Sequence, residues 1–222
     1  MELIPGTIMS AKDVSLWMTE RMHQNVSRTP VREAFLSLAK EGLVNLLPQR
    51  GTEVSLINVR RAMEERFIRI TLEGAAIDKF VEFAKKEHYE KMDYCILLQS
   101  QAIDRGDNLA YVQLDNAFHE ILYQVTGNML SHHIVMTMNG HYDRMRVMTT
   151  WSYSNVQGSI EQHRAILQCL RNGDAAAARK LLDQHLSKLL TEKSELIRDY
   201  PEFFDMTGEV KEMDRDIRVW ET

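Results

Sequence analysis

Apolar residues recur every three or four positions along residues 58–198, a stretch that contains no proline. This spacing is typical of helices that bury one face. Three dipeptides divide the stretch, because glycine can end one helix while asparagine or aspartate caps the next: Gly106-Asp107, Gly127-Asn128 and Gly173-Asp174. The pattern predicts an antiparallel all-α bundle with short loops, made of six helices at residues 58–84, 86–105, 108–126, 129–149, 158–171 and 174–198.

The beginning of the chain follows a different pattern. Ser27 or Thr29 can cap a helix that Gly42 is suited to end. Two strand-like runs, 43–47 and 52–56, then flank a Pro-Gln-Arg-Gly turn and predict a small hairpin. The expected buried stripe of the helix consists of Val31, Ala34, Phe35, Leu38 and Ala39.

A helix followed by a small hairpin is the arrangement of a winged helix-turn-helix, whose second helix reads the DNA major groove. We therefore predict a mainly α fold with an N-terminal winged helix-turn-helix at residues 1–57 and the all-α bundle at 58–198. A charged tail is expected at 199–222. Residues 10–22 suit a further amphipathic helix of the first domain.

Composition and charge narrow the possible partners. No apolar run approaches the length of a membrane-spanning helix, so we expect no membrane association. The two cysteines, Cys95 and Cys169, fit the reducing cytoplasm better than a disulfide framework. The net charge of −5 argues against nucleic acid as a partner. In residues 1–57, however, basic and acidic side chains balance, so a local basic cluster can still bind DNA.

The sequence around the predicted helix and hairpin is specific. The string SRTPVREAF at 27–35, EGLV at 41–44, and then Pro48, Arg50-Gly51 and Val54 resemble the DNA-binding signature of GntR-type bacterial transcription regulators. The resemblance implies that double-stranded operator DNA is a partner. It also implies which residues touch DNA: Arg28, Thr29 and Arg32 on the recognition helix, and Arg50 and Gly51 at the tip of the wing.

The resemblance has departures. The family has a helix of about a dozen residues before the Pro-Gly that corresponds here to Pro5-Gly6, and the stretch from Gly6 to Ser27 is longer than usual. We therefore expect the first helix of the domain to be missing. This leaves open an alternative interpretation, a related metal-binding interaction module with an impaired DNA-binding head.

A second group of residues can bind a metal ion. Asp115 and His119 are four residues apart and share one helical face. His163 and His185 lie on either side of the predicted turn at Gly173, at similar heights on two antiparallel helices. One carboxylate and three imidazoles suit a divalent ion such as Zn²⁺, Ni²⁺ or Mn²⁺. From spacing alone, ordinary surface or core histidines remain an equally good interpretation.

Four segments of the bundle resemble the FCD domain of the FadR branch of GntR regulators: residues 64–76, 115–128, 159–167 and 172–186. The resemblance implies that Asp115, His119, His163 and His185 hold a divalent metal ion. It also implies an adjoining cavity for a small carboxylate effector, for which Arg144 and Arg146 are candidate partners.

The function expected from both resemblances is a DNA-binding transcription regulator, in most cases a repressor, that acts as a homodimer and is not an enzyme. A metallohydrolase is the less favoured alternative. One ion with open positions can activate water, but no spare general base and no paired Glu-x-x-His pattern is recognisable.

Overall fold

The computed structural model describes residues 8–9, 14 and 26–206. The chain forms two compact units. One comprises the described residues up to Val59 and from Ile197 onward, and the other comprises residues 60–196. The helix expected at residues 10–22 lies outside the described residues, apart from the single position Val14. The expected absence of the family's first helix concerns the same part of the chain and stays a prediction.

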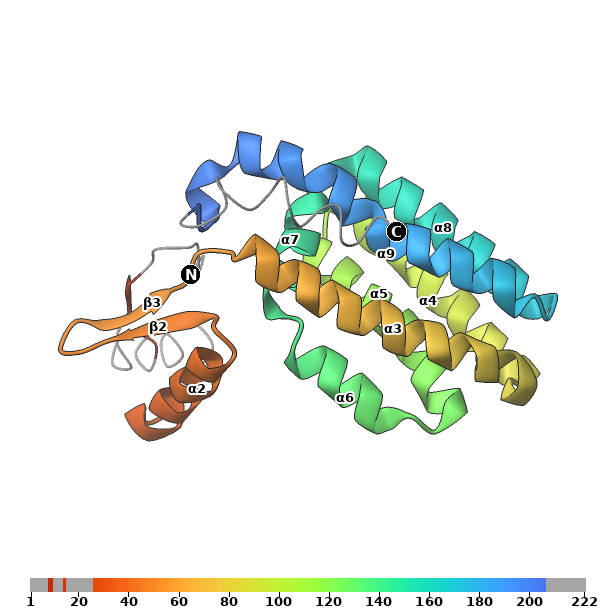
Figure 1. The fold of residues 1–222 in the computed structure, drawn as a ribbon, viewed down its shortest axis with the longest axis horizontal. Helices are drawn as coiled ribbons and strands as arrows, with labels where there is room; N and C mark the ends of the chain where they lie inside the picture. Colours follow the sequence, from red (N-terminus) through yellow and green to blue (C-terminus); the bar gives the residue numbers. More distant parts are fainter. Residues whose placement is uncertain (1–7, 10–13, 15–25, 207–222) are drawn as a thin grey trace. The chain divides into compact units, whose positions relative to one another are not determined.

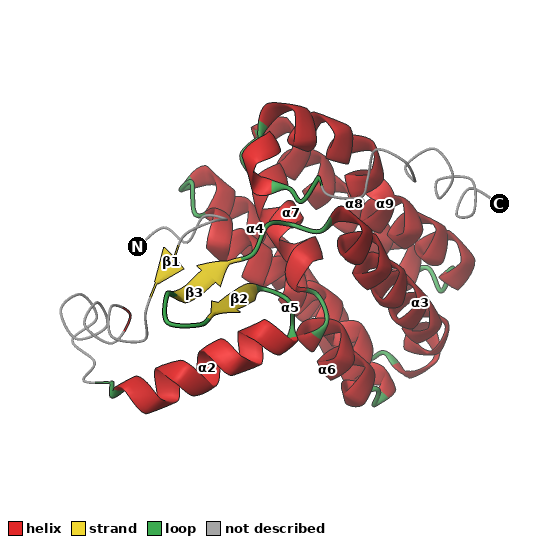
Figure 2. Ribbon diagram, turned by 60° about the vertical axis from the view of Figure 1, so that its left-hand side comes forward, coloured by secondary structure: helices red, strands yellow, loops and turns green. Residues whose placement is uncertain are grey.

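The first unit contains a helix and a small antiparallel sheet (Figure 2). Helix α2 spans Arg28–Lys40 and is followed by strands β2, Val44–Leu47, and β3, Gly51–Val54. Strand β1, Ile8–Met9, pairs with the other side of β3, so the strand order is β1-β3-β2. In the hairpin, Val44 lies opposite Val54 and Leu47 lies opposite Gly51. The predicted helix and wing are therefore confirmed.

The local signals for α2 explain its ends. Ser27 is the N-cap residue in extended conformation, and Gly42 follows the C-cap with φ +77°, a left-handed conformation that glycine adopts without strain. Val31 and Phe35 are buried against Met9 and Val54. The predicted stripe was too wide, because Ala34, at the edge of the face formed by Val31 and Phe35, is exposed.

The segment expected to begin a charged tail includes ordered structure. Pro201–Phe203 form a short 3₁₀ helix, η1. Phe204 then forms a parallel bridge with Ile57, and both side chains are only 2% exposed. Backbone bonds from Ile57 to Phe203 and from Asp205 to Ile57 fix this contact within the first unit. Residues 207–222 lie outside the described part.

The second unit is a bundle of antiparallel helices (Figure 1). Its core is formed by large side chains that are almost fully buried, among them Phe80, Phe118, Leu122, Ile160 and Leu182. The helices are α3 (Val59–Phe83), α4 (Lys86–Asp104), α5 (Asn108–Thr126), α6 (Met129–Thr137), α7 (Gly140–Thr149), α8 (Tyr153–Arg171) and α9 (Ala175–Asp199).

Two of the predicted helix boundaries were wrong. The helix expected at 129–149 is divided into α6 and α7, because Met138 and Asn139 leave the helical conformation. Asn139 is 1% exposed, its carbonyl accepts from the Asp143 amide, and its side chain donates to Asp143 Oδ1 at 2.7 Å. Asn139 is the N-cap residue of α7, and its side chain bonds to the Asp143 side chain and not to the helix backbone. Helix α8 begins at Tyr153, five residues before the predicted start at 158.

The mainly α fold class with a small winged hairpin is confirmed. Within the described ranges, no helix is both long enough and apolar enough to cross a bilayer.

Candidate metal centre

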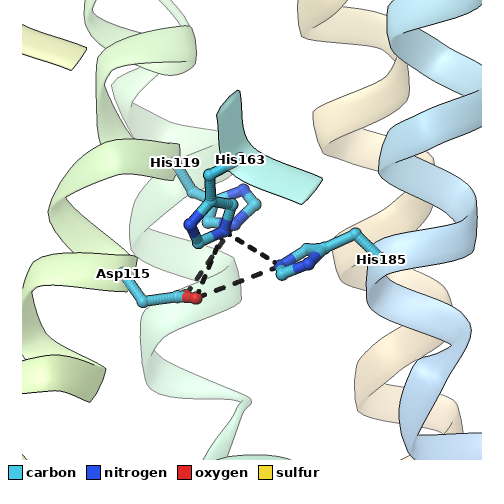
Figure 3. Close-up of side chains that lie close together, drawn as sticks. All are labelled: Asp115, His119, His163 and His185. Carbon is cyan, nitrogen blue, oxygen red and sulfur yellow. Dashed lines mark hydrogen bonds and ion pairs between the residues drawn. The ribbon is translucent and has the colours of Figure 1, made fainter. Parts of the chain in front are cut away.

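The four predicted ligands converge inside the helical unit, where their ligand atoms all lie within 4.8 Å of one another. Asp115 and His119 come from α5, His163 from α8 and His185 from α9 (Figure 3). Gly173, with φ +73°, makes the tight turn that folds α9 back along α8. Asp115, His119 and His163 are at most 3% exposed, so the group is shielded from water.

The distances suit a shared ion. His163 Nε2 lies 3.1 Å from His185 Nε2 and 3.4 Å from Asp115 Oδ1. Asp115 Oδ1 is 3.9 Å from His185 Nε2, and Asp115 Oδ2 is 3.8 Å from His119 Nε2. Metal–ligand bonds of about 2.0–2.2 Å place neighbouring ligand atoms roughly 3–3.5 Å apart. The observed separations match this spacing or exceed it by a few tenths of an ångström.

Partners on the outer side of each ring set the protonation of the histidines. His163 Nδ1 is 2.8 Å from Gln99 Oε1, and the Gln99 amide nitrogen donates to the Leu114 carbonyl, so the oxygen must face the ring. His185 Nδ1 is 3.0 Å from Gln162 Oε1. Because both glutamine oxygens only accept, each Nδ1 carries the hydrogen and each Nε2 presents a lone pair inward.

His119 follows the same plan, with a carboxylate as its outer partner. Its Nδ1 lies 2.7 Å from Glu73 Oε2, so its Nε2 also faces the centre. Both ring nitrogens of His119 are buried, and neither makes a hydrogen bond of good geometry among the described residues. Such carboxylate–histidine pairs typically orient metal ligands and raise their basicity.

A centre without a cation would be electrostatically unfavourable. Two imidazole lone pairs would face each other at 3.1 Å beside a carboxylate, among side chains that are almost completely buried. Protonation does not relieve this, since burial lowers the pKa of His163 to about 3 and also holds the pKa of His185 well below its ordinary value. The donor set therefore fits a divalent ion of the borderline type.

Two buried arginines compensate the carboxylates. Arg69 Nε is 2.7 Å from Glu73, and Arg69 Nη2 is 3.6 Å from Asp115 Oδ2. Arg146 also pairs with Asp115 Oδ2. Burial alone would raise the pKa of Asp115, but Arg146 and the other neighbours hold it well below the ordinary range. In the same way Arg69 and His119 outweigh burial and lower the pKa of Glu73 to about 2. Both groups are carboxylates at neutral pH.

A cavity of about 50 Å3 adjoins this centre, and Asp115 and His185 are part of its wall. Arg146, a candidate partner for the effector, also lines the cavity. Its guanidinium is already bonded to Asp115, to Asn116 Oδ1 at 2.8 Å and to Asp143 Oδ1 at 2.6 Å. Arg144, the other candidate, does not line the cavity.

The outer partners of the three histidines were missed in the sequence. Arg69 and Glu73 stand four residues apart in the segment at 64–76, and the i,i+4 spacing of opposite charges was the only signal available. Gln162 directly precedes His163. Gln99 lies 64 residues from the histidine it contacts, so nothing in the local sequence points to it.

The outer partner of His163 gives a first prediction. In the Gln99→Leu variant, His163 Nδ1 loses its acceptor, and we expect metal affinity to fall by about 10- to 100-fold, the usual cost of losing such a partner. Competition with a chromogenic chelator measures the affinity. Gln168→Leu, on the exposed side of α8, is the matched control and should leave it unchanged. Equal affinity in both variants would contradict the assigned role.

The predicted DNA-contacting residues lie in the first unit. Arg28, Thr29 and Arg32 are exposed at the beginning of α2, and Arg50 is exposed in the turn between β2 and β3. Gly51 is half-buried and has φ +119°, a conformation that requires glycine. The structure thus presents two arginines and a threonine on one helix end and one arginine at the hairpin tip.

Comparison with known proteins identifies both units. The model of the FCD domain matches residues 66–188, and the model of bacterial regulatory proteins of the gntR family matches residues 21–54. The chain belongs to the GntR family. As a GntR-family protein with an FCD domain, it is a DNA-binding transcriptional regulator. Both domains are those of transcription regulators, a class that is generally not enzymatic.

The relatives of this GntR-family chain are similar over most of their length. The HTH-type transcriptional repressor RspR of Escherichia coli (strain K12) is 29% identical over 91% of this chain and 86% of that protein. The HTH-type transcriptional repressor NanR of Enterobacter sp. (strain 638) is 26% identical over 74% of this chain and 70% of the length of NanR. Among solved structures, E. coli McbR/YncC has a TM-score of 0.71 at 20% identity, covering 89% of this chain and 90% of that one. This last similarity shows the shared fold.

Proposed function

We propose that this regulator is a cytoplasmic, metal-dependent repressor whose DNA binding is controlled by a small carboxylate effector. The observation that supports it most is the convergence of Asp115 and three histidine lone pairs beside a cavity. The repressor names of RspR and NanR agree with this direction of control. A divalent ion held by Asp115, His119, His163 and His185 would supply a Lewis-acidic position for the carboxylate.

The residues of the chain would orient this ion and its ligand. Glu73, Gln99 and Gln162 hold the three imidazoles with their Nε2 atoms inward. Arg146 holds Asp115 through Oδ2, which leaves Oδ1 directed at His163 and His185. An effector carboxylate that enters the cavity meets both the metal ligands and the Arg146 guanidinium. Because Asp115 is on α5 and Arg146 is on α7, binding of the effector beside this ion pair would change the contact between the two helices.

DNA reading is assigned to the first unit. We propose that Arg28, Thr29 and Arg32 contact the major groove and that Arg50 and Gly51 reach the adjacent backbone or groove. Two copies related by a two-fold axis would present two such heads to a palindromic operator, so we expect a homodimer. The effector then shifts the population between DNA-competent and DNA-incompetent arrangements.

The recognition helix gives the second prediction. Arg32→Ala should weaken operator binding and, if Arg32 neutralises a phosphate, reduce the slope of log affinity against log salt by about one. If Arg32 instead contacts a base edge, the loss is about 1–3 kcal/mol and is confined to the specific sequence. Fluorescence anisotropy at two salt concentrations distinguishes these cases.

Lys40→Ala is the matched control, since Lys40 is exposed at the opposite end of the same helix. Unchanged affinity of Arg32→Ala at both salt concentrations would exclude Arg32 from the interface. Weak binding of the wild type to operator and scrambled DNA alike would favour the alternative, an interaction module with an impaired head.

A further inference from the structure

One face of α9 forms the wall of the cavity that leads away from the metal ligands. His185, Lys188 and Glu192 are spaced by three and four residues, so their side chains follow one another along the helix. Lys188 and Glu192 are only 23% and 13% exposed, and Lys188 Nζ is 3.5 Å from Glu192 Oε1. An ammonium donor and a carboxylate acceptor thus lie side by side where a ligand bound at the metal would end.

Hydroxyl groups continue this polar wall on the other helices. Lys188 Nζ is 3.3 Å from Ser159 Oγ of α8, and the Ser159 hydroxyl and Lys188 Nζ both donate to the Asn155 carbonyl. Thr149 of α7 also lines the cavity. Burial raises the pKa of Glu192, the direction expected for a carboxylate shielded from water. A hydroxyl suits such a wall because it both donates and accepts hydrogen bonds.

The charges around the cavity limit the charge of the ligand. Among the described side chains, seven charged groups line the cavity or belong to the network in which Arg69 and Arg146 pair with Asp115 and with one further carboxylate each. The three cations are Arg69, Arg146 and Lys188, and the four carboxylates are Glu73, Asp115, Asp143 and Glu192. Their net charge is therefore −1. A divalent ion changes it to +1, which one carboxylate neutralises. A second carboxylate would leave an excess negative charge beside Glu192, in a site with little water to screen it.

The size of the cavity limits the length of the ligand. The space open to the centres of water-sized groups is about 50 Å3, which suits a small ligand such as a three-carbon acid.

From these observations we infer that the cavity selects a short hydroxylated monocarboxylate, and that Lys188, Ser159 and Glu192 recognise its hydroxyl end. The inference rests on the proposed function, because it assumes that the carboxylate end of the effector binds at the metal centre. Lys188 and Glu192 then discriminate against two kinds of competitor. An apolar end offers neither group a hydrogen bond, and a carboxylate end is repelled by Glu192.

Three acids with the same three-carbon chain test this selectivity. They are propionate, with a methyl end, 3-hydroxypropionate, with a hydroxymethyl end, and malonate, with a second carboxylate. Isothermal titration calorimetry on the metal-loaded full chain measures their affinities, and metal content is determined before and after each titration so that chelation is recognised. We expect 3-hydroxypropionate to bind at least about tenfold more tightly than the other two.

The Glu192→Gln variant tests whether Glu192 is the residue that rejects a second carboxylate. The variant removes the negative charge but keeps the size, so we expect malonate to gain about tenfold in affinity relative to 3-hydroxypropionate. Glu90→Gln makes the same chemical change at an exposed position of α4, outside the cavity, and should keep the wild-type order of affinities.

The outcomes separate this inference from the proposed function. If the three acids bind the wild type equally, or if Glu192→Gln leaves the affinity of malonate relative to 3-hydroxypropionate at its wild-type value, the hydroxyl selectivity is wrong while carboxylate binding stands. If no acid binds the metal-loaded wild type, both the selectivity and the carboxylate effector are wrong.

Discussion

The His163→Ala variant is expected to lose its bound metal ion, whereas the wild-type chain purified with divalent metal should hold about one ion per copy. His163 is fully buried, and its Nε2 is the ligand atom nearest to both His185 and Asp115. Its removal opens the centre of the ligand set. We therefore expect a greater loss of affinity than the about 10- to 100-fold that removal of an outer partner costs. Elemental analysis after dialysis measures the metal content.

Controls keep this result interpretable. His133→Ala removes an exposed histidine of α6 and should leave the metal content at the wild-type level. Because truncation of a buried ring also leaves a cavity, far-UV circular dichroism must show a folded helical unit. His185→Ala is a second variant in case His163→Ala does not fold, since His185 has an 8% exposed side chain at the cavity wall. Full metal occupancy in either folded variant would contradict the proposed ligand set.

Arg69→Met is expected to destabilise the metal-free protein by about 3–5 kcal/mol, the usual cost of removing one partner from a buried ion pair. The Arg69 side chain is 2% exposed and pairs with Glu73 and Asp115, whose side chains are 1% and 4% exposed. Without the guanidinium, Glu73 is left without its cation, and Asp115 retains only Arg146. Urea unfolding followed by circular dichroism gives the free energy of unfolding.

The same variant links stability to the metal. A divalent ion restores positive charge next to Asp115, so added metal should stabilise Arg69→Met more than the wild type. Arg171→Met is the control, because it removes a guanidinium from an exposed ion pair: the Arg171 and Asp93 side chains are 37% and 51% exposed. This variant should lower the free energy of unfolding by less than about 1 kcal/mol. A comparably small loss for Arg69→Met would show that the buried network does not compensate the carboxylates as described.

The sequence predicted those parts of the molecule that local patterns determine. The helix start at Ser27, the left-handed Gly42 and the turn at Gly173 are each specified by one or two neighbouring residues. The i,i+4 spacing of Asp115 and His119 places both on one face, and the turn at Gly173 brings His163 and His185 to the same height. The structure brings these four together.

What the sequence could not predict depends on contacts between distant segments. Gln99 becomes the partner of His163 only when α4 packs beside α8, and its identity as an outer partner follows from its second bond to Leu114. By contrast, the division between α6 and α7 has a local signal, because the Asn139-Gly140 dipeptide stands where the helix breaks. The prediction of one continuous helix missed this signal.

Arg146 shows the same limit for a single side chain. From the sequence it was a candidate partner of an effector, equal to Arg144. In the structure Arg146 lines the cavity and is held by Asp115, Asn116 and Asp143. The difference between the two arginines arises from the start of α7 at Gly140, which sets the direction in which each residue points.

The proposed control of DNA binding is tested most directly by titrating a short hydroxy-carboxylate into the complex of the full chain with DNA from upstream of its own gene, followed by fluorescence anisotropy. Scrambled DNA and the metal-depleted protein serve as references. We predict selective binding of the upstream DNA and its release by the acid only when the protein is loaded with metal. Binding without preference for the upstream DNA, or release that does not depend on metal, would contradict this mechanism.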